Sequence, residues 1–87
     1  MYTKNMIIPD DAKDYEDLGD KYQDSNPEKA IQYYEMSIDI FDGNACVWHK
    51  LSGCYYDVGD VNACTNANEM IYELDPNFYT DFPLIRG

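Results

Sequence analysis

The chain has 87 residues, of which 17 are acidic and 6 are basic, so its formal net charge at neutral pH is −11. This length allows one small domain that buries about 60–65% of its unfolded surface, and the charge repels nucleic-acid phosphates and anionic membranes. We therefore expect a protein or peptide partner, basic ones included, and no nucleic acid.

Residues 1–9 show no helical periodicity, and Pro9 disfavours a helical conformation at Ile8. We expect this arm to be extended or disordered. A helix should begin after Asp10 or Asp11, either of which offers a carboxylate to the free amides of the first turn. Its predicted packing face holds Tyr15, Leu18, Gly19 and Tyr22. The charged residues on its opposite face are Lys13, Glu16, Asp17, Asp20 and Asp24.

A second helix is predicted from Pro27 to about Phe41. Asn26 is a capping residue, and proline suits the first helical position because the amide that it lacks has no partner there. Gly43 can supply the left-handed residue that ends the helix. The apolar residues that follow the helical period are Ala30, Ile31, Tyr34, Ile38 and Phe41.

The third predicted helix, about 45–58, is capped by Asn44 and ends near Gly59. Its packing face holds Trp48, Leu51, Ser52 and Tyr55. Asp60 opens a fourth helix, which ends at Asp75-Pro76 because proline cannot continue the hydrogen-bond ladder. The residues predicted to point inward from it are Val61, Cys64, Ala67, Ile71 and Leu74. Residues 10–76 thus form the expected helical domain, and residues 77–87 form an apolar tail.

The first and third helices share the motif aromatic-x-x-Leu-small-x-x-Tyr at a spacing of 33 residues. The two copies are Tyr15-Leu18-Gly19-Tyr22 and Trp48-Leu51-Ser52-Tyr55. In the second and fourth helices, Ala30 matches Cys64 and Tyr34 matches Asn68 at a spacing of 34. The sequence therefore contains two copies of one helix-pair unit, over roughly residues 11–77.

This period and motif resemble the tetratricopeptide repeat, and residues 27–35 are similar to the helical repeats of the SNAP vesicle-fusion adaptors. The first copy departs from the pattern by a shorter turn and by Asp42-Gly43 in place of proline, the second by Asn68 in place of an aromatic. The resemblance implies an all-α fold of two antiparallel helix pairs in a short right-handed α-solenoid. It also implies a non-catalytic adaptor or scaffold whose concave groove, lined mainly by the first helix of each pair, binds a peptide or partner helix.

Carried over position by position, the resemblance assigns nine residues to that groove. They are Lys13, Glu16, Asp20 and Asp24 from the first repeat, and Cys46, His49, Lys50, Gly53 and Tyr56 from the second. Relatives that grip a C-terminal carboxylate use Lys and Asn where this chain has Glu16 and Asp20, so we do not expect that mode of binding. Acidic residues beside Tyr56 suit a Lys- or Arg-containing segment; a merely solvated acidic face is the other interpretation.

Cys46 and His49, three residues apart on one helix, are the nearest approach to a catalytic or metal-binding pair. The small helical unit offers little to orient a base or exclude water around them, and the chain has one histidine. We expect no enzyme activity, no cofactor and no metal site. Cys54 and Cys64 are predicted to be small apolar packing residues.

An odd number of cysteines without a Cys-x-x-Cys pair does not make a disulfide framework, so reduced thiols are expected. Met6-Ile7-Ile8-Pro9 is too short for the apolar core of a signal peptide, and no run is long enough to span a bilayer. These observations predict a soluble cytoplasmic protein without membrane insertion.

Two repeats are fewer than the three or more that usually stand alone, so the outer face of the last helix needs a cover. Three covers stay open: the apolar tail folding back, a second copy of the chain, or the end of a partner's own repeat array. Apolar residues near both termini motivate self-association. The alternative function is therefore a structural subunit that oligomerises or caps through its helix-stacking faces.

Overall fold

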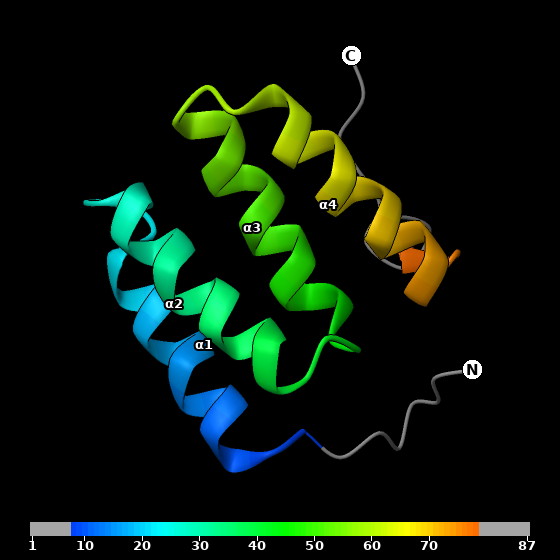
Figure 1. The fold of residues 1–87 in the computed structure, drawn as a ribbon, viewed down its shortest axis with the longest axis horizontal. Coiled ribbons are helices and arrows are strands. Elements are labelled where there is room, and N and C mark those ends of the chain that lie inside the picture. The colour runs from blue at the N-terminus through cyan, green and yellow to red at the C-terminus, as the bar shows by residue number, and fades with distance from the viewer. Residues whose placement is uncertain (1–7, 79–87) are drawn as a thin grey trace.

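The computed structural model describes residues 8–78, which form four α-helices. In chain order they are α1 (Asp10–Tyr22), α2 (Pro27–Ile40), α3 (Ala45–Asp57) and α4 (Val61–Leu74). Successive helices run in opposite directions, with α2 and α3 side by side in the middle of the view and α4 beyond α3 (Figure 1). α1 packs on α2, α2 on α3 and α3 on α4. The predicted all-α fold of helix pairs is confirmed, and the described part of the chain contains no strand.

Three of the four helices begin at the capping residues that the sequence predicted. The capping side chains are Asn26, Asn44 and Asp60, and each accepts a backbone N–H of the first turn, at 3.2, 3.0 and 3.1 Å respectively. Pro27 occupies the first turn of α2. Each cap satisfies an amide that has no partner within its own helix.

The start of α1 differs from the prediction. Pro9 precedes the helix and makes no side-chain cap, while Asp10 and Asp11 both lie inside the first turn. The helix begins early enough for these carboxylates to be helical themselves, so they cannot act as the cap. They still stabilise the helix, because they lie at the positive end of its dipole.

The end of α2 also differs. Phe41 has an extended backbone (φ −152°) and its N–H donates to the carbonyl of Ser37 at 3.0 Å. Among residues 8–78 the one positive φ is that of Gly59, at +84°. The chain therefore leaves α2 by an extended segment, so the left-handed role predicted for Gly43 is wrong, and Gly59 has that conformation in the turn between α3 and α4.

The largest fully buried side chains come from α2, α3 and α4. They are Tyr34, Val47, Leu51 and Ile71. Tyr34 and Ala30 of α2 join Val47, Leu51 and Cys54 of α3 in one buried cluster. The core therefore lies largely at the junction of α2 and α3, where the two helix pairs meet.

The α1–α2 contact depends on two small residues. A Cβ at Gly19 would overlap the ring of Tyr34, so glycine allows this close approach. The hydroxyl of Ser37 donates to the carbonyl of Ala12 at 2.7 Å, and both residues are buried. These contacts fix the register of the first pair.

On α4, Ala67 and Ile71 are buried as predicted, whereas Val61 is 66% exposed. The inward orientation predicted for Val61 is wrong because the helical period places it about 120° from Ala67 around the helix. No described helix is both long and apolar enough to cross a bilayer.

Candidate functional site

Lys50 of α3 joins the two helix pairs through carboxylates of α1. Its ammonium lies 2.8 Å from Oε2 of Glu16 and 3.0 Å from Oδ1 of Asp20. Burial alone would lower the pKa of Lys50, but hydrogen bonds to these two carboxylates outweigh burial and raise it. The lysine is therefore firmly cationic. We call the surface on which these three side chains lie the α1–α3 face.

Glu16 has further partners. Asn44, before α3, donates to Oε1 at 3.5 Å, and Lys13 lies 3.8 Å from the same atom. Lys13 also pairs with Asp17 at 3.2 Å, and its pKa is raised by this hydrogen bond first and by Glu16 second. Glu16 is only 5% exposed. The expectation that it lines an open groove is wrong, because Lys50 and Asn44 draw its carboxylate into the contact between the pairs.

Tyr34 of α2 is hydrogen-bonded to this charged cluster from the core. Its hydroxyl donates to Oδ1 of Asp20 at 2.6 Å, and the residue is fully buried. Burial raises the pKa of Tyr34 well above its ordinary value, and the hydrogen bond to Asp20 raises it further. Asp20 thus connects a core hydroxyl with Lys50 at the surface.

The predicted groove residues Asp24, Gly53 and Tyr56 are all exposed. Tyr56 is 74% exposed, and a Cβ built on Gly53 would meet no atom within 4 Å. Asp57 and Asp24 both raise the pKa of the buried Cys54 thiol, after the larger effect of burial. Asp57, at the end of α3, and Asp24, just after α1, therefore both exert their negative charge on the same thiol. No ion pair joins either of them to a cation within residues 8–78.

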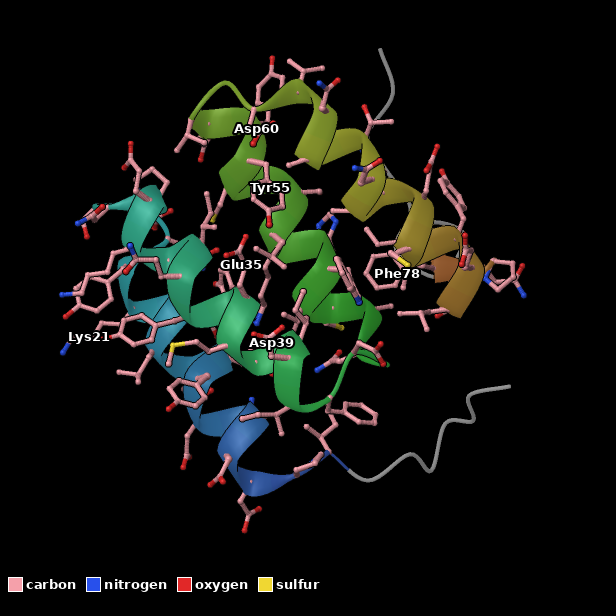
Figure 2. The ribbon with its side chains drawn as sticks, viewed as in Figure 1. Lys21, Glu35, Asp39, Tyr55, Asp60 and Phe78 are labelled. Carbon is pink, nitrogen blue, oxygen red and sulfur yellow. The ribbon has the colours of Figure 1, made fainter. Side chains whose placement is uncertain are left out.

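His49 contacts the start of the C-terminal tail. Its ring centroid lies 5.4 Å from that of Phe78, with the rings tilted by 48°. Phe78 is 5% exposed and lies at the end of α4 toward α3 (Figure 2). The first apolar residue of the predicted tail therefore packs against α3, and residues 79–87 lie outside the described part of the chain.

Cys46, the cysteine three residues before His49, has a thiol whose surroundings disfavour the thiolate. Cys46 is exposed as a residue, but partial desolvation of its thiol raises its pKa, and the negative charge of Glu16 raises it further. A raised pKa reduces the thiolate that nucleophilic chemistry needs. No group of three metal-binding side chains occurs among the residues that the structure describes.

Sequence reasoning missed one contact between α2 and α3 and one between α3 and the segment that precedes it. The hydroxyl of Tyr55 donates to Oε2 of Glu35 at 2.6 Å, and Nε1 of Trp48 donates to the carbonyl of Asp42 at 2.8 Å. The labelled Tyr55 and Glu35 point toward each other in Figure 2. The aromatic positions were predicted to pack, but no local pattern indicates which polar atom a ring reaches.

A third missed feature is an aromatic stack across α1 and α2. The ring of Tyr33 stacks between Tyr15 and Tyr22, with centroids 6.3 and 5.9 Å away. Lys29 and Lys21 approach the ring of Tyr22 to 4.6 and 5.6 Å. Tyr33 does not follow the helical period of the core residues of α2. Because it is adjacent to the core residue Tyr34, it lies on a different side of the helix, and this was the one sequence signal for a second aromatic surface.

Comparison with family models, with curated proteins and with solved structures gives no match to this chain. The tetratricopeptide resemblance therefore stays a prediction that rests on the internal repeat.

Proposed function

We propose that this chain is a non-catalytic protein-interaction module, similar to tetratricopeptide adaptors, that binds a peptide or partner helix through Asp24, Gly53 and Tyr56. The observation that carries the proposal is the exposed Tyr56, 74% accessible, one helical turn from the open position at Gly53 on α3. An exposed aromatic ring on a chain whose formal net charge is −11 suits a ligand that brings its own positive charge.

The carboxylates of the α1–α3 face differ from Asp24 and Asp57. Glu16 and Asp20 are neutralised by Lys50 and hold the helix pairs together. Asp24 and Asp57 leave their charge for a ligand. A Lys- or Arg-containing segment is therefore the ligand class that we propose, in contact with Asp24, Gly53 and Tyr56, whereas Lys13, Glu16, Asp20 and Lys50 shape the face.

Two observations support a non-catalytic role. The raised pKa of Cys46 opposes nucleophilic chemistry, and His49 packs on Phe78. The cysteines at 46, 54 and 64 are unpaired, which suits a reducing compartment such as the cytoplasm.

The test uses fluorescent peptides of about a dozen residues with Lys or Arg at every second position, and the same peptides with Glu instead. We expect the basic peptides to bind and Asp24→Lys with Tyr56→Ala to weaken binding about tenfold, through the lost charge pairing and cation–π contact. Fluorescence anisotropy measures the affinity.

The matched control is Asp39→Lys with Tyr72→Ala, which makes the same chemical changes at exposed positions on α2 and α4. This variant should bind as the parent does. Equal binding of the basic and acidic peptides, or an equal loss in the control, would contradict the proposal. Circular dichroism of both variants checks that they remain folded.

A further inference from the structure

The internal repeat allows α1 to be compared with α3, whose contact with α2 the structure shows. Val47, Leu51 and Cys54 of α3 are at most 3% exposed in the cluster with α2. The residues 33 positions earlier on α1 are Asp14, Leu18 and Lys21. Leu18 is half-buried and the other two are exposed. α1 therefore leaves open the face that its equivalent uses to contact a helix.

Other features of this open face match the internal junction. Trp48 and Tyr55 flank the buried residues of α3, and Tyr15 and Tyr22 occupy the equivalent positions on α1. Lys21 points away from α3 in Figure 2, so the face lies on the opposite side of the first pair from the second. We call the surface of Tyr15, Leu18, Lys21 and Tyr22 the outer α1 face.

α2 extends this surface and adds charge to it. Met36 and Ile40, one helical turn apart, are 42% and 44% exposed, and the ring of Tyr33 lies between those of Tyr15 and Tyr22. Lys29 lies 4.6 Å from the Tyr22 ring. With Lys21, two of the six basic residues of the chain therefore surround one aromatic ring.

A second copy of the chain fits this face poorly. The residues of α4 equivalent to Ile31, Tyr34 and Ile38 lie 34 positions later, and they are Thr65, Asn68 and Tyr72. α4 thus replaces two apolar side chains with polar ones, keeps a glutamate, Glu69, at the position of Glu35, and has no basic residue to pair with Asp14. Stacking of two copies in the geometry of the α2–α3 junction would remove Asp14 from water without a cationic partner on α4, which is unfavourable.

We propose that the outer α1 face is a second docking site, separate from the one at Tyr56, and that it receives a helix of another protein with an apolar stripe and a carboxylate opposite Lys21 and Lys29. The apolar stripe covers Leu18 and the tyrosine rings, as α2 covers Leu51 and its neighbours. The carboxylate pairs with Lys21, which occupies the position that the smaller, neutral Cys54 has at the internal junction. A glutamate at the position of Glu35 would also accept the hydroxyl of Tyr22, as Glu35 accepts that of Tyr55.

The test uses two stapled helical peptides with the sequence of residues 27–41, because α2 is the helix that the equivalent face of α3 binds. One carries Ala30→Glu and the other Ala30→Lys, since Ala30 belongs to the same buried cluster as Cys54. Staples are needed because a free helix of this length is marginal in water. We expect the Glu peptide to bind about tenfold more tightly than the Lys peptide at low salt.

Lys21→Glu should reverse this order, whereas Asn66→Glu, which adds a carboxylate at an exposed position of α4, should leave it unchanged. Chemical-shift changes at Leu18, Tyr22 and Lys29 should accompany binding. The proposal is overturned if neither peptide binds at about 1 mM, if both substitutions act alike, or if light scattering shows self-association that Leu18→Lys abolishes.

Discussion

The two helix pairs place different side chains at equivalent positions of close packing. In the first pair, Gly19 lies directly against the ring of the fully buried Tyr34. In the second pair the equivalent residues are Ser52 and Asn68, and the hydroxyl of Ser52 donates within its own helix to the carbonyl of His49, at 2.9 Å. The first pair thus has a large ring next to a glycine at these positions, whereas the second pair has two smaller polar side chains. The period of a repeat specifies where helices approach but not the sizes of the residues that meet there.

The largest effect is expected at the Gly19 contact. Gly19→Ala places a methyl group inside the ring of Tyr34, which cannot move because it is enclosed on all sides. We expect a loss of about 1–3 kcal/mol in the free energy of unfolding, measured by urea denaturation. Ser52→Ala is the matched change in the second pair and should cost less than about 1 kcal/mol. Equal losses would show that the two pairs do not differ in packing.

An exchange of side chains between the pairs should have an intermediate effect. Asn68→Tyr brings the ring of the first pair into the second, where Ser52 occupies the position of Gly19. We expect Ser52→Gly to relieve part of the resulting strain, with a coupling of about 1 kcal/mol in a double-mutant cycle. Strictly additive losses would mean that residues 52 and 68 do not meet as residues 19 and 34 do. Thermal unfolding followed by circular dichroism provides the four stabilities.

The smallest expected effect concerns the hydroxyl that distinguishes Tyr34 from Asn68. Burial, and next the bond to Asp20, raise the pKa of Tyr34 above its ordinary value near 10.0. The unfolded state therefore ionises first, so this contribution to stability is complete below pH 10 and falls as the pH rises above 10.

Tyr34→Phe should lose about 0.5 kcal/mol at neutral pH and show a shallower decline of stability in alkaline solution. Tyr55→Phe is the comparison in the second pair, since the pKa of Tyr55 is also raised, by burial and then by Glu35. Urea denaturation from about pH 8 to about pH 12 measures both slopes. A parent slope retained in Tyr34→Phe would contradict the assignment to this hydroxyl.

Features fixed by neighbouring residues in the chain could be predicted from the sequence. The caps at Asn26, Asn44 and Asp60 are local, because each side chain accepts an amide two or three residues away. The burial of Glu16 could not be predicted, because its main cation, Lys50, is 34 residues away and belongs to the other pair. Charge on a helix predicts an exposed face unless a distant partner removes it from solvent.

The same distinction applies to the candidate site. The helical period places Gly53 and Tyr56 on one side of α3, and both are exposed. Whether a carboxylate such as Asp20 is open to a ligand or held by Lys50 and Tyr34 depends on how the pairs are docked. That relation is tertiary and has no counterpart in the spacing of residues along one helix.

Trp48 has a practical consequence for studying this protein. It is the chain's one tryptophan, and its indole N–H donates to the carbonyl of Asp42 where the chain passes from one pair to the next. Its fluorescence therefore reports on the seam between the pairs rather than on the ends of the chain. Trp48 fluorescence reports separation of the two pairs, and circular dichroism reports melting of the helices. Together they distinguish the two events without any added label.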